Sequence, residues 1–309
     1  MTRTIPKAEQ NDEDRKTTWI WPVTCICILA LGLGLGLGLG LRNNNEEEKE
    51  EEQQQSTIDG SVAPYSMSNF NAYQWIDLTY SFNNKTTYWP TSPSDFELNV
   101  LAYGETDGGY FYSSNSICTP EHGGTHLDAP IHFSAGTWTT DDIPLERLNG
   151  NGIVMDVSAQ ASIDPDYRLT LQDVLEFEKE YGDIPESSIV MLRTGWGKKY
   201  GDKLAYLGDD TPGEASNLHF PGYGEESALY LVETRQVSIL GIDTASIDYG
   251  PSTDFIVHRI ACDANVPGLE NVANLDLLPA TGSWIIALPM KIEGGSGGPA
   301  RIVALVPRN

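Results

Sequence analysis

The sequence predicts an α/β or α+β domain with a mixed β-sheet core and few helices. Short segments rich in β-branched residues recur along the chain, two segments with helical spacing lie between them, and no internal repeat is present. The 309 residues suffice for one large core, because single α/β domains reach about 250 residues. We expect the folded domain to occupy residues 73–309.

The expected strands are short runs of apolar and β-branched residues. Such residues fit the pleated, half-buried surface of a sheet. Because helical patterns separate only some of these runs, we expect a mixed sheet and not an all-parallel one. In chain order the candidates are 75–80, 152–157, 188–193, 238–243, 283–288 and 300–305.

Two segments show the spacing of an amphipathic helix. Thr170 can cap a helix that starts at Leu171 and ends at Gly182, shortly before Pro185. A second helix is expected over residues 225–235, where apolar residues recur on one stripe. Both helices fall between expected strands, as an α/β or α+β domain requires.

The first 72 residues differ from the rest in composition. Residues 18–41 carry no charge and have membrane-spanning length, which predicts a transmembrane signal-anchor. Basic residues before the segment and acidic residues after it place residues 1–17 in the cytoplasm, as a tail. Residues 42–72 are then a polar, acidic stalk.

This topology puts the folded domain in the lumen or outside the cell, or makes it secreted if the segment is cleaved. The alternating leucine and glycine of residues 31–41 weaken the expectation, because glycine has poor helix propensity. Two cysteines of the folded region, Cys118 and Cys262, either pair or remain separate thiols.

The net charge bears on possible partners. At −25, with only 19 Lys and Arg, the chain is not expected to bind nucleic acid, since phosphate binding needs clustered basic residues. A small-molecule substrate is the expected partner.

Three of the five histidines lie between residues 122 and 132. The glycines at 123 and 124 disfavour a helix, so we expect a tight loop that enters a strand. If 126–128 is extended, His126 and Asp128 point to the same face, and the loop lets His122 fold back to meet them. Two imidazoles and one carboxylate leave coordination positions open, which is typical of a catalytic site for zinc or a similar divalent ion.

His132 is expected to act differently from the other two histidines. It follows Pro130, which cannot continue a central strand, so the pattern places His132 beside the metal and not on it. An imidazole with a pKa of about 6.5 suits proton transfer. Downstream, Asp243 and Asp248 follow a buried strand and, taken alone, are interpreted as turn and capping residues.

The stretch from His122 to Phe133 resembles the H-x-G-T-H-x-D-x-P-x-H-F signature of the cyclase family. That family includes bacterial-type kynurenine formamidase and isatin hydrolase. The similarity continues through residues 143–150, 192–196, 220–222, 241–248 and 270–275, so it covers about residues 73–307, the whole folded region.

The resemblance implies a single domain of the swivelling β/β/α type, usually assembled as a homodimer or larger oligomer. It implies a site for one or two divalent ions, Zn²⁺ first and Mn²⁺ as the alternative, because residue 270 is Glu where members with one ion have Gln. The implied metal ligands are His122, His126, Asp128, Glu270 and His258, and the implied acid/base is His132.

The resulting hypothesis is hydrolysis of a C–N amide bond in a small aromatic substrate, N-formylkynurenine or a lactam such as isatin. The long segment 198–219 is similar to the isatin hydrolase branch, which leaves the substrate open. The alternatives are a non-catalytic, membrane-displayed binding module and a structural zinc domain. Aromatic residues that could stack on the substrate are Trp89, Phe133, Trp138 and Trp196.

Overall fold

The computed structural model describes residues 70–308, which belong to one compact unit. Its centre is an eight-stranded sheet of order β1-β12-β11-β5-β7-β9-β10-β4, in which β4 also pairs with β12. This extra pairing closes the sheet on itself. The strands are β1 (Tyr73–Asp77), β4 (His126–Asp128), β5 (Asn149–Asp156), β7 (Ile189–Arg193), β9 (Ile239–Ile242), β10 (Gly268–Glu270), β11 (Ser283–Pro289) and β12 (Gly297–Pro307).

The expected mixed sheet is confirmed. Strands β5, β7, β9 and β10 run parallel, whereas β1, β11, β12 and β4 pair antiparallel with their neighbours. The parallel strands β7 and β9 are almost wholly buried, as sheets covered on both faces require. Five of the expected strands match β5, β7, β9, β11 and β12 within a few residues, and the sixth, 75–80, is shifted to β1.

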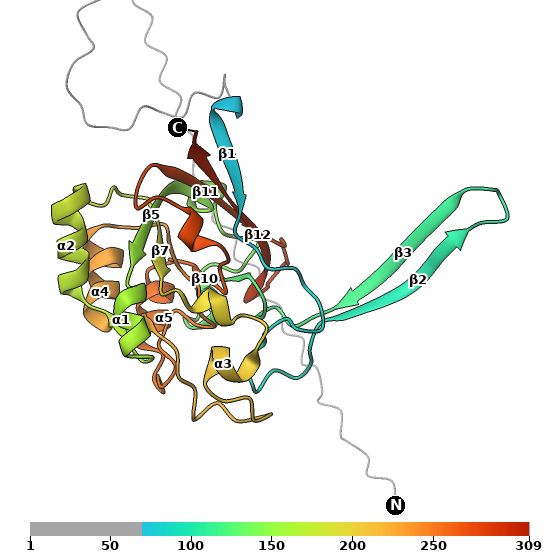
Figure 1. The fold of residues 1–309 in the computed structure, drawn as a ribbon, viewed down its shortest axis with the longest axis horizontal. Helices are drawn as coiled ribbons and strands as arrows, with labels where there is room; N and C mark the ends of the chain where they lie inside the picture. The colour runs from blue at the N-terminus through green and yellow to red at the C-terminus, as the bar shows by residue number, and fades with distance from the viewer. Residues whose placement is uncertain (1–69, 309) are drawn as a thin grey trace, which may run out of the picture. The chain divides into compact units, whose positions relative to one another are not determined.

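Two hydrophobic clusters cover the two faces of the sheet. In β7, Val190 and Leu192 join the cluster under the helices, while Ile189 and Met191 join the cluster inside the closed sheet. Figure 1 shows α1, α2, α4 and α5 gathered on one side of the sheet. The helices are α1 (Ser158–Ile163), α2 (Leu171–Tyr181), α3 (Lys203–Leu207), α4 (Glu225–Leu229) and α5 (Ile256–Asp263).

The two helices expected from spacing are present. In α2 the Thr170 side chain accepts a hydrogen bond from the Asp173 amide, and Gly182 ends the helix with a φ of 89°. The second expected helix begins as α4 and continues as a π-helical turn over Tyr230–Thr234.

Several elements were not expected from the sequence. They are α5, β10, the short paired strands β6 (Arg168–Leu169) and β8 (Gly222–Tyr223), and a hairpin of β2 (Glu97–Glu105) and β3 (Phe111–Cys118). Figure 1 shows this hairpin projecting away from the sheet. Cys118 is exposed, Cys262 is buried and both are free, so they are two separate thiols.

The prediction of a membrane-anchored protein is corrected. Between residues 70 and 308, no helix has both the length and the apolar character to cross a membrane. The expected tail, anchor and most of the stalk (1–17, 18–41 and 42–72) lie outside the described residues. The composition argument also has a physical weakness, because every second residue of 31–41 is glycine and each costs about 1 kcal/mol of helix stability relative to alanine. The single-pass, lumenal placement is therefore withdrawn.

Candidate metal centre

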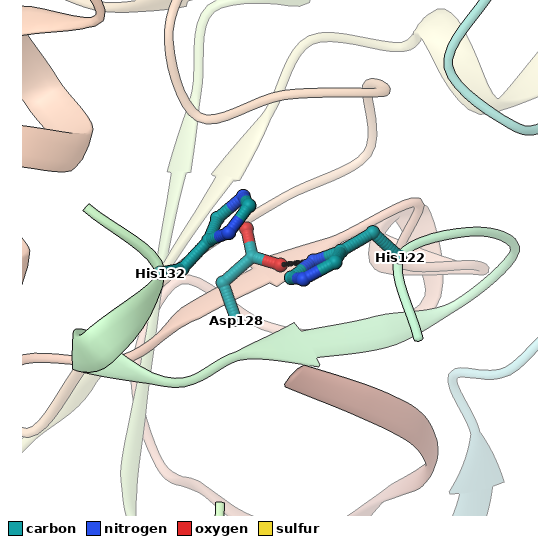
Figure 2. A group of neighbouring side chains, drawn as sticks. All are labelled: His122, Asp128 and His132. Carbon is teal, nitrogen blue, oxygen red and sulfur yellow. Dashed lines mark hydrogen bonds and ion pairs between the residues drawn. The ribbon is translucent and has the colours of Figure 1, made fainter. Parts of the chain in front are cut away.

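The loop before β4 brings His122 back onto the strand. Gly123 lies against the ring of Tyr88, where a Cβ would come within 2.1 Å of the ring carbons, and Gly124 has a φ of +56°. Only glycine tolerates both demands without strain. The expected loop that enters a strand is thus present, and Figure 2 shows His122 and Asp128 pointing at one another with His132 beside them.

A strand pairing brings Glu270 to the same point, and a helix brings His258. Strand β10 runs antiparallel to β4 and sets Glu270 directly opposite His126. His258 comes from α5, close to its N-terminus. One ligand atom from each of His126, Asp128 and Glu270 lies within 4.8 Å of the others, and all three residues are buried.

Hydrogen bonds fix which nitrogen of His122 faces the cluster. The Ser296 hydroxyl donates its one proton to Glu121 Oε2 at 2.7 Å, so it must accept from His122 Nε2–H at 2.9 Å. The proton of a neutral His122 is therefore on Nε2. Its Nδ1 then presents a lone pair 2.6 Å from Asp128 Oδ1, an arrangement of two acceptors that a shared cation would stabilise.

His126 and His258 follow the same rule. His126 Nδ1–H donates to the Gly124 carbonyl at 2.9 Å, and His258 Nδ1–H donates to Asp248 Oδ2 at 2.7 Å. His126 Nε2 is buried 3.1 Å from Asp128 Oδ1, yet it has no hydrogen-bond partner among the described residues. His258 Nε2 lies 3.2 Å from both Asp128 Oδ2 and Glu270 Oε1. Each inner nitrogen thus faces carboxylate oxygens.

The charges of the cluster also favour a cation. Burial and the negative charge of Asp128 raise the pKa of the Glu270 carboxyl, because two buried carboxylates repel one another. Burial lowers the pKa of His126, but Asp128 and Glu270 outweigh it and raise the value to about 9. A proton and a metal ion therefore compete for the same nitrogen. Imidazole and carboxylate donors suit zinc or manganese, so the residues fit a divalent ion.

His132 lies at the edge of this cluster, on the 3₁₀ turn Pro130–His132. Its ring stacks on that of His122, with ring centres 3.9 Å apart and planes inclined by 20°. Partial desolvation lowers the pKa of His132 below its ordinary value, so the imidazole is neutral near pH 7 and can accept a proton. One of its ligand atoms also lies within 4.8 Å of those of His122 and Asp128.

A cavity of about 250 Å³ opens above the cluster. Its walls include Trp89 and Phe133, two of the expected stacking residues. Trp138 does not line it and packs in the core near Arg147, and Trp196 is buried with its indole N–H donated to the Tyr206 carbonyl. Of the expected stacking residues, Trp138 and Trp196 therefore lie outside the lining of this cavity.

Sequence reasoning missed other residues of the cavity and its support. Phe255 faces the cavity beside Phe133, with ring centres 5.3 Å apart, and has a φ of 50°. Glu121 and Ser296 hold His122. The sequence carries one signal for Ser296, since this serine sits among glycines. The structure gives the reason for Gly297, because a Cβ there would come 2.6 Å from His122 Cε1.

The downstream carboxylates have separate roles. Asp243 accepts hydrogen bonds from the Thr194 and Gly195 amides and so fixes the turn after β7. Asp248 accepts from the amides of Val257 and His258 at the start of α5, and its Oδ2 also orients the His258 ring. The turn and capping interpretation therefore holds, and Asp248 supports the metal cluster as well.

Comparison with known protein sequences adds independent information. A family model described as a putative cyclase matches residues 76–249. An isatin hydrolase from Roseibium aggregatum is 36% identical over 220 residues, which cover 69% of this chain and 81% of that protein. A kynurenine formamidase from Salinibacter ruber is 28% identical over 233 residues, or 74% of this chain and 95% of that protein.

Solved structures show the same fold. An isatin hydrolase bound to the product analogue thioisatinate matches with a TM-score of 0.71 and 30% identity, over 77% of this chain and 94% of that chain. The expected fold, a mixed sheet with few helices, is confirmed by this match, and the closure of the sheet is a further finding of the structure.

Glu270→Gln should lower the affinity for Zn²⁺ or Mn²⁺ while the domain stays folded, because the two side chains have nearly the same size and only Glu carries a charge. Isothermal titration calorimetry on the metal-stripped protein measures the change. Glu146→Gln, a substitution of an exposed glutamate, is the matched control and should bind metal like the wild type. Unchanged stoichiometry and affinity in Glu270→Gln would remove Glu270 from the site.

Ser296→Ala should weaken metal binding by about 10- to 100-fold, the usual effect of removing a partner that orients a ligand. Ser296→Thr keeps the hydroxyl and should restore most of the affinity, whereas loss in both variants would point to a general packing defect. Ser162→Ala, on the exposed side of α1, controls for loss of a serine elsewhere. The same titration, with circular dichroism as a check of folding, decides the outcome.

Proposed function

This chain belongs to the cyclase family of hydrolases, and on that premise we propose that it cleaves a C–N amide bond in a small aromatic molecule. The observation that carries the proposal is the convergence of three imidazole nitrogens on two buried carboxylates below an aromatic-walled cavity. Such a donor set at the floor of a cavity is typical of a hydrolytic metal site.

The two oxygens of each proposed carboxylate ligand face different histidines. Asp128 Oδ1 faces His122 and His126, while its Oδ2 faces His258. Glu270 likewise reaches His126 with one oxygen and His258 with the other. Asp128 and Glu270 would therefore hold one or two divalent ions together with His122, His126 and His258, with Zn²⁺ first and Mn²⁺ as the alternative. When bound, such an ion supplies Lewis acidity, which polarises the scissile carbonyl and makes water more acidic.

His132 is the proposed acid/base. Its neutral ring accepts a proton from the attacking water and then returns it to the departing amide nitrogen, so that the C–N bond breaks with no net change in the protein. Stacking on His122 holds the ring beside the cluster. Asp128 is on the same side and stabilises the imidazolium that forms between the two proton transfers.

A cyclic amide of the isatin type is the preferred substrate class. The isatin hydrolase relative is more similar to this chain than the kynurenine formamidase relative, at 36% against 28% identity. Trp89, Phe133 and Phe255 give the cavity flat apolar walls that suit a planar ring system. N-formylkynurenine remains the second candidate, because the formamidases match a larger share of this chain.

The two alternatives from other classes are not supported. The membrane-displayed binding module lacks support because the related proteins are named for hydrolytic reactions and no described helix could span a membrane. A structural zinc domain would normally close its site with cysteine, whereas the described cluster is built from histidine and carboxylate and lies open to a cavity.

Metal-loaded protein should hydrolyse isatin with a kcat/KM at least about tenfold above that for N-formylkynurenine, a difference of about 1.4 kcal/mol in transition-state binding. Loss of substrate absorbance measures both reactions. A reversed ratio would assign the chain to the formamidase type. No turnover of either substrate by protein with full metal content would contradict the proposed substrate class.

His132→Ala should keep most of its metal and lose roughly 10²- to 10⁴-fold in rate, the range expected when a general acid/base is removed. His126→Ala deletes a proposed metal ligand and should lose metal together with turnover. His219→Ala is the matched control, since His219 is exposed and pairs with Asp166 outside the cavity. Metal content by mass spectrometry separates the cases: a metal-free His132→Ala would make His132 a ligand.

A further inference from the structure

A second cavity lies next to the cavity above the metal cluster. Its volume is about 270 Å³, close to the value of about 250 Å³ for the catalytic cavity. Among the described residues, Tyr88 and Trp89 line both cavities, and the two linings share no other residue. The side chains of these two residues therefore form the wall between the cavities.

Two segments that are distant in the sequence enclose the second cavity. They are residues 88–95 and residues 203–212. Leu207, which is 2% exposed, belongs to the lining and also to a small hydrophobic cluster. The Pro90 carbonyl accepts a hydrogen bond from the Gly213 amide at 3.0 Å, which ties the turn after Trp89 to the second segment. The cavity is thus a hollow that the fold itself builds.

The two residues of the shared wall differ in how firmly they are held. Tyr88 is buried, and its ring lies against Gly123 in the loop that carries His122. Trp89 is half-buried and contacts other rings, with its ring centre 6.3 Å from those of both Phe220 and Phe255. Trp89 is therefore the part of the wall that a substitution can remove while the metal loop keeps its support.

We propose that Trp89 limits the size of the substrate by separating the catalytic cavity from the second cavity. The proposal rests on the hydrolysis of a cyclic aryl amide proposed above. An unsubstituted two-ring amide fits on the catalytic side of the indole. A substituent on its benzene ring meets the indole, and close-packed side chains accommodate added atoms only at a cost in binding. Removal of the indole joins the two cavities and gives the substituent a place.

The charges of the second cavity determine which substituent it suits. Its charged lining residues are Asp95, Asp210 and Lys203. Lys203 Nζ lies 3.4 Å from Asp95 Oδ1, so these two charges compensate one another. Asp210 leaves the lining with a net negative charge. Because complementary charge gives specificity, the joined cavity should favour a substituent that carries an ammonium group.

The test uses isatin and isatins that carry an aminomethyl group at each free carbon of the benzene ring in turn. Metal-loaded wild type should hydrolyse isatin with a kcat/KM at least about tenfold above that of every aminomethyl isatin. In Trp89→Ala the ratio of kcat/KM for aminomethyl isatin to that for isatin should rise at least about tenfold at one or more ring positions. Trp89→Leu keeps an apolar contact with Phe220 and should give a smaller rise.

Phe255→Ala is the matched control. It also removes an aromatic ring from the catalytic cavity, but Phe255 does not line the second cavity, so the ratio should stay at the wild-type value. Asp210→Asn added to Trp89→Ala should reduce the rise for aminomethyl isatins. Isatins with a carboxymethyl group at the same positions should gain less than the aminomethyl compounds. Circular dichroism checks the fold of each variant, and Trp89→Leu serves if Trp89→Ala is unfolded.

Four results would overturn the proposal. One is a wild type that hydrolyses aminomethyl isatins as fast as isatin. A second is an unchanged ratio in Trp89→Ala, and a third is a rise of the same size in Phe255→Ala. The fourth is an equal gain for aminomethyl and carboxymethyl isatins at every position, which would place the substituent outside the second cavity. Absence of isatin turnover by the wild type would contradict the proposed function instead, and calorimetric binding of the same compounds to the metal-loaded proteins then makes the comparison without turnover.

Discussion

Two buried carboxylates placed side by side are the constraint on which the site depends. Asp128 and Glu270 have side chains that are 2% and 7% exposed, and they come from neighbouring strands whose register is fixed by the closed sheet. Burial of two adjacent negative charges is costly unless positive charge compensates for it. The three histidines turn their inner nitrogens to these oxygens, so the cluster can be neutralised by protons or by metal ions. Ser296, the Gly124 carbonyl and Asp248 each accept a hydrogen bond from the outer ring nitrogen of one histidine. In its neutral form, each histidine therefore turns the lone pair of its inner nitrogen towards the carboxylates.

Local sequence patterns were enough to predict one half of this cluster. His122, His126 and Asp128 lie in one short stretch, and two glycines indicate the turn that joins them, so the loop and the strand could be predicted together. The strands around it were found because they are buried and rich in β-branched residues. The helix α2 was found because Thr170 and Gly182 mark its ends. Each of these signals is contained within about a dozen neighbouring residues.

The other half depends on contacts between distant segments. Glu270 reaches the site because β10 pairs with β4, and His258 does so because Asp248 accepts hydrogen bonds at the start of α5, a helix of only eight residues. Family resemblance, not spacing, pointed to both residues. The aromatic residues are a further case: Trp89 and Phe133 line the cavity, whereas Trp138 is partly buried against the hydrophobic cluster inside the closed sheet, and no local pattern distinguishes the two environments. The hairpin of β2 and β3 was missed because β3 is rich in serine and the bulge in β2 breaks the alternation of apolar and polar residues.

The hairpin of β2 and β3 and the loop that carries His122 share one short stretch of chain. Strand β3 ends at Cys118, and Glu121 and His122 follow almost at once. Between them Thr119 hydrogen-bonds to the Tyr88 hydroxyl at 2.6 Å, and the Tyr88 ring lies against Gly123. The same tyrosine thus contacts the end of the β2–β3 hairpin and the loop that carries His122, and it lines the cavity. Glu121 accepts a hydrogen bond from the Ser296 hydroxyl, and that hydroxyl accepts one from His122 Nε2–H, so two hydrogen bonds connect the segment after β3 with the ring of His122.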